Sequence, residues 1–188
     1  SIIIEFFFQE IQKIKLYIVK KKKNKKFCKG DIIFWRGHVG ICINKTKFII
    51  DTFGVKYTKN VMSAHRTPHA VMELIQNSED NGCKVFIAAA GMAAHLAGAV
   101  AAHSTRPVIG IPIESGGMGG IDSLLSTAMM PPGVPVATVA VGKSGAKNSA
   151  ILAVQILATG DENLAQKLVE YKQNMRDEVL DKDKKLNS

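Results

Sequence analysis

From about residue 54 onward, short apolar runs alternate with segments typical of helices. The apolar runs span residues 55–62, 83–89, 107–113 and 134–141. They are rich in Val and Ile without strict alternation, which is typical of strands covered on both faces. Helices are expected between and after them, at 68–82, 93–103, 121–129 and 146–159. This alternation predicts an α/β fold of three layers, a doubly wound parallel sheet with helices on both faces, because each crossover must return the chain to the same edge.

The positive charge of the chain is unevenly distributed. The 188 residues suit one compact domain, and the formal net charge is +9. Up to Asn60 there are fourteen Lys and Arg against four Asp and Glu, whereas from Val61 onward eleven basic residues face twelve acidic ones. The basicity therefore belongs to the front of the chain, so we expect neither nucleic acid nor a membrane as a partner of the body.

The opening segment, residues 1–26, is apolar at first and ends in a run of lysines. In a secretory signal the positive charge precedes the apolar run, and here Glu5 and Glu10 also interrupt it. We therefore expect a surface-lying amphipathic helix that ends in a solvated lysine run. Cys28, Cys42 and Cys83 lie far apart without metal-site spacing, which favours a reducing, cytoplasmic setting without disulfides or structural zinc.

Four unusual loops follow the predicted strands of the body: "SAHR" at 63–66, "AAGMAAH" at 89–95, "ESGGMGG" at 114–120 and "GKSGAKN" at 142–148. In an open parallel sheet, ligands bind at the carboxyl ends of the strands, so these loops should face one rim. Their glycines would let backbone N–H groups approach an anion closely. The sequence thus predicts a site for a phosphorylated or carboxylated small molecule.

Two histidines of these loops are candidates for chemistry. His65 stands between Ser63 and Arg66 at a strand end, which favours a functional role over a solvent-exposed flanking imidazole. His95 begins a helix, and its position alone leaves both a capping and a site role open. His69 and His103 are expected on the surface. The "ESGGMGG" loop matches neither a Walker pattern nor a dinucleotide fingerprint, which disfavours nucleoside triphosphate and dinucleotide cofactors.

Several long motifs, in order and nearly without gaps from about residue 54 to 174, carry a family resemblance. They are "SAHRTP", "AAAGMAAHLAGAVAA", "PVIGIPI", "GIDSLLSTAMMPPGVPVATVAVG" and "GAKNSAILAVQILA". Together they resemble the class I 5-(carboxyamino)imidazole ribonucleotide mutases of bacterial purine synthesis. The resemblance implies a flavodoxin-like fold, a homo-octamer in the cytoplasm, and no metal or organic cofactor. It also implies a small imidazole ribonucleotide as substrate, whose carboxylate moves from the exocyclic nitrogen to a ring carbon.

The resemblance also implies roles for individual residues. His65 matches the family's catalytic histidine, which carries the proton. Arg66 matches a substrate-binding arginine, whose planar fork suits phosphate or carboxylate. His95 matches a second histidine of the site, for which we expect positioning of the carboxylate or carbon dioxide. The remaining matched positions line the nucleotide pocket: Ser63, Ala64, Ala90 and Gly91.

The front of the chain departs from this family. Family members begin with a strand and a Gly-Ser-x-Ser-Asp loop that holds phosphate and ribose. Here an apolar run at Val39–Ile43 could serve as the first strand, but Asn44–Lys47 follows it in place of the serine and aspartate. Residues 27–52 instead resemble a fragment of an NlpC/P60 cell-wall peptidase with His38 as the matching base. The peptidase nucleophile motif Asp-Cys-Ser-Gly is absent, and Cys28 cannot replace it.

The chain is therefore expected to divide into an atypical basic segment at 1–53, for which a fusion remnant is one candidate origin, a mutase-like α/β domain at 54–160, and a C-terminal helix and tail at 161–188. The C-terminal helix carries an apolar stripe that either packs against a neighbouring subunit or docks on its own domain: Leu164, Leu168, Tyr171, Met175 and Val179. Three functional readings stay open. They are an active mutase, a folded but catalytically impaired mutase-like protein, and a binding module that uses the basic run at 20–26.

Overall fold

The computed structural model describes residues 2–6, 49–115 and 117–188. Its centre is a five-stranded sheet in the order β2-β1-β3-β4-β5, in which every neighbouring pair is parallel. The strands are β1 (Ile2–Phe6), β2 (Tyr57–Val61), β3 (Val85–Gly91), β4 (Val108–Ile113) and β5 (Ala137–Thr138). This order is that of flavodoxin-like folds, so the predicted fold class is confirmed.

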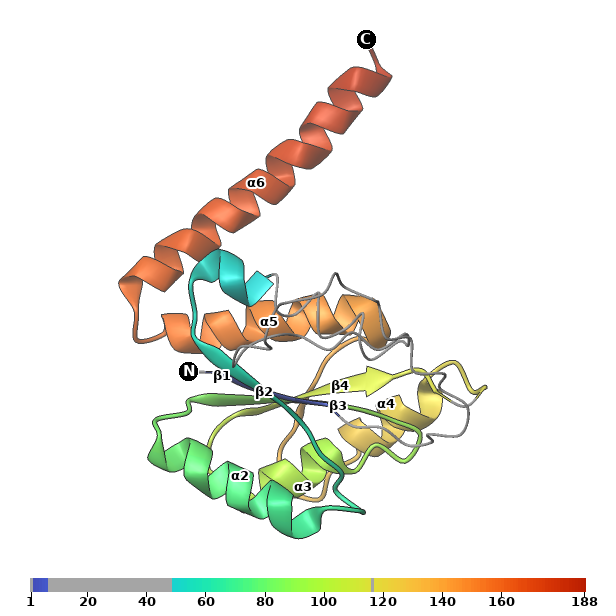
Figure 1. Ribbon diagram of the computed structural model, residues 1–188. Coiled ribbons are helices and arrows are strands. Elements are labelled where there is room, and N and C mark those ends of the chain that lie inside the picture. Colours follow the sequence, from blue (N-terminus) through green and yellow to red (C-terminus); the bar gives the residue numbers. More distant parts are fainter. Residues whose placement is uncertain (1, 7–48, 116) are drawn as a thin grey trace, which may run out of the picture.

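Helices cover both faces of the sheet (Figure 1). They are α2 (Pro68–Asp80), α3 (Leu96–His103), α4 (Ile121–Ala128), α5 (Gly142–Ala158) and α6 (Glu162–Leu186). Helices α2, α3 and α4 lie on one face, and α5 with the helical turn at 49–53 lies on the other (Figure 1). Each face has its own core, because β3 alternates between them: Ile87 packs toward α5, and Phe86 packs toward α2 and α3. The three predicted layers are present.

The first strand is the main correction to the sequence analysis. Ile2–Phe6 is not part of a surface helix; it lies between β2 and β3 and pairs with both, Ile4 with Lys59 and with Ile87. The physical reason is the run of three isoleucines, whose branched side chains favour a pleated strand once two neighbours are available. The alternative first strand at residues 39–43 lies outside the described residues, as do Cys28, Cys42 and the lysine run.

The predicted boundary at residue 53 does not coincide with a gap in the packing. Ile49, Ile50 and Phe53 are at most 6% exposed and belong to the same core as α5 and the sheet. Strand β1 likewise shares its sheet with strands of the body. The peptidase-like character of residues 27–52 stays a prediction, because residues 27–48 lie outside the described part.

Strand β5 is shorter than predicted. Only Ala137 and Thr138 pair with β4, whereas residues 134–141 were expected to form a full strand. Pro135 within this run has no N–H to donate, and β5 is at the edge of the sheet, where such a residue is tolerated. The chain is therefore half-exposed here before it enters α5.

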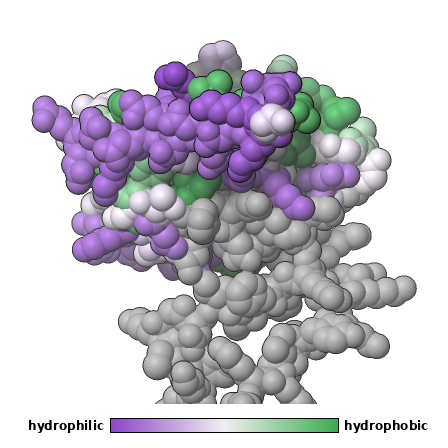
Figure 2. Space-filling model, turned by 90° about the horizontal axis from the view of Figure 1, so that it is seen from above, coloured by the Kyte–Doolittle hydropathy of each residue, from purple (hydrophilic) through white to green (hydrophobic). Residues whose placement is uncertain are grey.

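The C-terminal helix docks on its own domain through its first half, and packing of its stripe against a neighbouring subunit stays a prediction. Leu164 is buried, and Tyr171 packs on Phe53 with ring centroids 5.6 Å apart, so the first half of α6 docks on its own domain. The second half projects away from the domain (Figure 1), and there Met175 is 51% and Val179 63% exposed. Seen from above, this side of the molecule is largely hydrophilic with smaller hydrophobic areas (Figure 2).

Helix α4 buries hydroxyl side chains and exposes apolar ones, which is the reverse of the usual arrangement. Ser123 and Thr127 are buried against the domain, whereas Ile121, Leu125 and Met129 are 55–78% exposed. The buried hydroxyls are satisfied by carbonyls: Ser123 donates to Ile113 or Gly120, and Thr127 donates to Ser123. A surface helix normally turns its apolar stripe toward the core, so the outward stripe of α4 is an apolar surface that its own domain leaves uncovered.

Candidate functional site

The polar loops singled out in the sequence meet at one edge of the sheet. Because all five strands are parallel, the segments that follow β2, β3 and β4 leave from the same carboxyl edge. The fourth predicted loop, residues 142–148, is not a loop: it forms the start of α5 (Gly142–Ala158), which follows β5 at the same edge. The predicted common rim is therefore present.

Two histidines meet on this rim. Nε2 of His65 lies 2.8 Å from Nδ1 of His95, and the two rings are perpendicular, with centroids 4.9 Å apart and an interplanar angle of 77°. His65 follows β2 and His95 follows β3, and β1 lies between these strands. The pair thus spans the carboxyl end of β1, beside the point between β1 and β3 where the strand order reverses. Both rings are exposed to solvent and so accessible to a ligand.

A tight turn holds His65. The Ser63 hydroxyl accepts from the Arg66 N–H at 2.7 Å, and the Ser63 carbonyl accepts from the Thr67 N–H at 2.9 Å. The Thr67 hydroxyl accepts from the Ser63 N–H at 2.8 Å and donates back to its carbonyl at 3.1 Å. Thr67 is the N-cap and Pro68 begins α2, as predicted, but the threonine hydroxyl is used by the turn and caps no helix N–H. His65 is therefore fixed by its own neighbours.

The other residues of this turn differ in what they offer to a ligand. Arg66 is exposed, and its guanidinium has no hydrogen-bond or ion-pair partner among the described residues, so its planar fork is available to a phosphate or carboxylate. Ser63 is 5% exposed and its oxygen already accepts a hydrogen bond. Ala64, which is half-buried, packs against the core under α2 and α3. The pocket-lining roles expected of Ser63 and Ala64 stay predictions.

The loop after β3 is constrained from two sides. A Cβ on Gly91 would lie 1.9 Å from the Ser115 hydroxyl oxygen and 3.0 Å from the Ile113 carbonyl oxygen, so only glycine fits there. Met92 has φ +56°, the only positive φ of a non-glycine residue in the described chain. Ala90 and Gly91 are buried, so what they present to a ligand is backbone. Sequence reasoning named Ala90 and Gly91, and it missed Ser115.

Serines on α4 form hydrogen bonds with the loop after β3 and with the end of β4. Ser126 accepts a hydrogen bond from the Ala94 N–H at 2.9 Å, directly before His95. Ser123, fully buried, reaches the Ile113 carbonyl at the end of β4. Sequence reasoning missed both residues. Their spacing with Thr127, which places three hydroxyls on one face of an otherwise apolar helix, was the available signal.

The glycine loop after β4 has the backbone that its composition predicts. Gly117, Gly119 and Gly120 have φ values of +81°, +63° and +82°, conformations that favour glycine. Gly120 is also packed closely, since a Cβ there would lie 2.6 Å from a methyl group of Val141. Gly116 lies outside the described residues. The loop can bring backbone N–H groups toward an anion at the rim.

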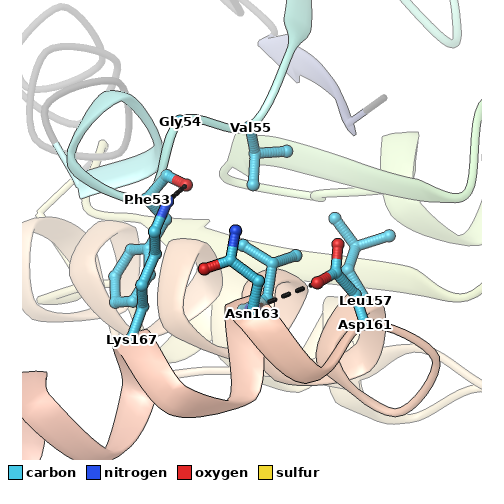
Figure 3. A pocket seen from close by; sticks show the side chains of 8 residues that line it. Phe53, Gly54, Val55, Leu157, Asp161, Asn163 and Lys167 are labelled. Carbon is cyan, nitrogen blue, oxygen red and sulfur yellow. Dashed lines mark hydrogen bonds between the residues drawn. The ribbon is translucent and has the colours of Figure 1, made fainter.

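A separate hollow lies at the opposite edge of the sheet. It has a volume of about 330 Å³ and is lined by residues of the turn before β2, the end of α5 and the start of α6 (Figure 3). Two of its polar side chains join α6 to the domain or cap that helix: Lys167 donates to the Phe53 carbonyl at 3.2 Å, and the Asp161 carboxylate accepts from the Leu164 N–H at 3.1 Å. These contacts lie where α6 meets the domain, so the hollow is part of the interface between that helix and the domain.

Metal and membrane features can be assessed for the described residues. No group of three or more His, Cys, Asp or Glu side chains there is arranged to hold a metal ion. None of the helices in that part of the chain is long and apolar enough to cross a membrane. Cys83, buried two residues before β3, forms no disulfide within the described residues, and its thiol donates to the Val85 carbonyl at 3.5 Å.

The chain resembles known proteins in sequence and in fold. A family model described as AIR carboxylase matches residues 41–178. The N5-carboxyaminoimidazole ribonucleotide mutases of Bacillus subtilis and Methanocaldococcus jannaschii are 51% and 49% identical over 133 and 138 residues, which are 71% and 73% of this chain and 82% and 84% of theirs. The Escherichia coli K12 mutase is 47% identical over 133 residues, 71% of this chain and 79% of its own.

Among solved structures, Treponema denticola PurE superimposes with a TM-score of 0.75 at 23% identity. The superposition covers 100% of this chain and 99% of that one. At this identity the likeness concerns the fold, and it agrees with the flavodoxin-like strand order.

Proposed function

Because this chain belongs to the AIR carboxylase family, we propose that it is an N5-carboxyaminoimidazole ribonucleotide mutase of purine synthesis. The reaction moves a carboxylate from the exocyclic nitrogen of the imidazole ribonucleotide to ring carbon four. The observation that supports this assignment most directly is the contact between His65 and His95 on the accessible carboxyl edge of the sheet. An intramolecular carboxyl shift needs one proton carrier in a shielded site, and this pair supplies the carrier.

We assign the proton transfers to His65. In the first step, the C–N bond of the carbamate breaks, its electrons go to nitrogen, and protonated His65 donates a proton there, which releases carbon dioxide. In the second step, ring carbon four attacks the carbon dioxide to form the C–C bond. Neutral His65 then removes the proton from that carbon and restores the aromatic ring. The proton returns to His65, so the cycle closes without a net change on the enzyme.

His95 is the orienting partner of this proton carrier. In the hydrogen bond between Nε2 of His65 and Nδ1 of His95, one nitrogen donates and the other accepts, so the contact holds a single proton between the two rings. Such a partner fixes the ring orientation and the tautomer of the reacting histidine. We also assign to His95 the positioning of the carboxylate or the trapped carbon dioxide.

The remaining rim groups bind the ribonucleotide. The exposed guanidinium of Arg66 takes the phosphate or the carboxylate through two parallel N–H donors. Backbone groups at Ala90 and Gly91 and in the glycine loop line the pocket, with Ser63 and Ala64 supporting its floor. No further group is needed for the chemistry in this proposal, since neither step transfers electrons to or from a redox centre.

A second candidate is a mutase-like protein that binds the ribonucleotide poorly. In the sheet, β1 takes the place of the family's first strand, and the residues after it are Phe7, Phe8, Gln9 and Glu10. These offer neither of the two serines nor the aspartate that the family motif places after its first strand. On this reading, Arg66 and the glycine loop carry phosphate binding alone, and the chain turns over slowly or only at high substrate concentration.

We also propose that the protein acts as a homo-oligomer, an octamer by family resemblance, in the cytoplasm. The outward apolar stripe of α4 and the exposed apolar residues of the second half of α6 support this part of the proposal. Burial of large apolar side chains between subunits is favourable by about 25 cal/mol per Å². A second copy of the chain would cover both surfaces in a closed assembly.

The proposed activity is tested with substrate labelled by ¹³C in its carboxyl group. Purified protein should transfer the label from the carbamate signal to a carboxylate bound to ring carbon, faster than the label is lost as bicarbonate in buffer alone. Transfer with a strongly raised KM would favour the second candidate. Loss of label at the buffer rate, with no C-carboxylated product at any substrate concentration, would contradict a mutase activity.

A further inference from the structure

The helix α4 residue Ser126 reaches across to the loop that carries His95. Its hydroxyl oxygen accepts from the Ala94 N–H at 2.9 Å, and it lies 3.2 Å from the Met92 carbonyl oxygen. On its own helix it lies 2.8 Å from the Asp122 carbonyl and 3.3 Å from that of Ser123. A serine has one O–H to donate, and the short distance to Asp122 takes it, which leaves an oxygen lone pair aimed at Ala94.

The loop needs this acceptor. Ala94 is 1% exposed, so its N–H has no access to bulk water, and a buried N–H without a partner costs about 1–3 kcal/mol. Met92, two residues before Ala94, has φ +56°, a backbone conformation that is unfavourable for a residue with a side chain. Such a loop keeps its shape only when its surroundings hold it. Ser126 is the side chain that does so immediately before His95.

Ser126 differs in this respect from the other inward hydroxyls of α4. Thr127 donates to the Ser123 carbonyl on its own helix, and Ser123 reaches β4 and Gly120. Only Ser126 among these three bonds to the loop after β3. This bond acts close to the histidine pair, since Ala94 is the residue directly before His95.

We infer that Ser126 is a positioning residue for the histidine pair: it fixes the Met92–Ala94 loop so that Nδ1 of His95 stays in hydrogen-bond contact with His65. This inference rests on the proposed mutase function for its catalytic consequence, although the positioning itself does not depend on that function. Ser126 contacts neither histidine ring and acts through the backbone of the loop. Small displacements of a catalytic group cost about 10²-fold in rate for 1 Å, so loosening this loop should be visible in turnover.

The test compares Ser126→Ala with two other variants. Thr127→Val removes a buried hydroxyl of the same helix, keeps its shape, and touches no loop bond, so it controls for loss of stability in α4. Ser126→Thr keeps the hydroxyl and should restore the parent behaviour. We expect Ser126→Ala to lower kcat at least about tenfold with KM changed less than about threefold, and to alter the pH profile of kcat, whereas Thr127→Val should keep both.

A second measurement needs no turnover and separates this inference from the function. In protein with ¹⁵N-labelled histidine rings, the His95 Nδ1 signal should report a hydrogen bond in the parent, in Thr127→Val and in Ser126→Thr. In Ser126→Ala it should shift toward an unbonded ring. If the parent proves inactive, the proposed function fails while this result still decides the positioning role.

Two outcomes would overturn the inference. One is a Ser126→Ala variant whose His95 ring signals and pH profile equal those of Thr127→Val. The other can be measured in the parent, even if Ser126→Ala does not fold. We expect hydrogen exchange of the Ala94 amide in the parent to be strongly slowed. Exchange at the rate of an unprotected amide would show that Ser126 does not hold it.

Discussion

His65 and His95 come from different strands, thirty residues apart in sequence, yet Nε2 of one lies 2.8 Å from Nδ1 of the other. The turn at Ser63–Thr67 holds the backbone that carries His65, and the loop held by Gly91 and Ser126 carries His95. The two supports are independent, and they converge above the end of β1.

Replacing His95 by Asn should lower kcat by about a hundredfold, because His65 loses the partner that orients it, a loss typical of general acid–base groups. The fold should be unaffected, since the His95 ring is exposed. Steady-state kinetics and circular dichroism check both parts. His69→Asn, an exposed histidine on α2, is the matched control and should keep the parent kcat; equal kcat values for the two variants would contradict the role of the pair.

Replacing Gly91 by Ala should destabilise the protein by about 1–3 kcal/mol, the usual range for overpacking. The new Cβ would overlap the Ser115 hydroxyl oxygen, which lies 1.9 Å from its ideal position. Urea unfolding measures the loss, and adding Ser115→Gly should recover part of it, because that contact is then gone. Gly160→Ala, where a Cβ meets nothing within 4 Å, should cost little. A Gly91→Ala variant as stable as Gly160→Ala would contradict the close packing of these two strand ends.

Replacing Leu125 by Glu should reduce the oligomeric state without unfolding the subunit. Leu125 is 55% exposed and lies in the middle of the outward apolar stripe of α4, so a charge there is harmless in a monomer and costly in an interface. Light scattering after size exclusion measures the mass. Met72→Glu, at a 37% exposed methionine of α2, should leave the mass unchanged. An identical mass for parent and Leu125→Glu would exclude α4 from the interface.

Stability should fall at alkaline pH because of Tyr57. Burial, together with the carboxylate of Asp51 that accepts its hydrogen bond, raises the pKa of Tyr57 to about 12 from an ordinary value of 10.0. The folded state therefore keeps this proton when the unfolded chain loses it, so the contribution is complete below pH 10 and disappears between pH 10 and 12. Urea unfolding at several pH values should show this loss in the parent and a smaller one in Tyr57→Phe. Parallel curves for the two proteins would contradict the raised pKa.

The fold was largely predictable from the sequence because its strands are buried and its turns are local. β3 and β4 are apolar on both faces, and Thr67, Pro68 and Gly82 mark the limits of α2 as expected. The first strand was not predictable from its own residues. Glu5 and Glu10 break up the apolar opening, and only pairing with β2 and β3, more than fifty residues away, makes Ile2–Phe6 a strand.

The site was predictable in part, also because the strands are buried and the turns are local. His65, Arg66 and His95 stand in loops at strand ends, where the parallel topology places them on one rim. Ser126 and Ser115 were missed, because their contribution depends on how α4 and the end of β4 pack against the β3 loop. Periodicity along one helix shows that hydroxyls share a face, and it does not show which loop that face meets.

The account depends most directly on His65 as the proton carrier, so the deciding measurement is turnover of N5-carboxyaminoimidazole ribonucleotide by the parent and by His65→Asn, prepared identically. The account predicts measurable turnover in the parent and a loss of at least about 10²-fold in the folded variant, the scale expected for a general acid–base residue. Equal turnover in the two proteins would show that His65 does not carry the proton. A parent as silent as the variant, although folded, would mean that this chain has the mutase fold without the activity.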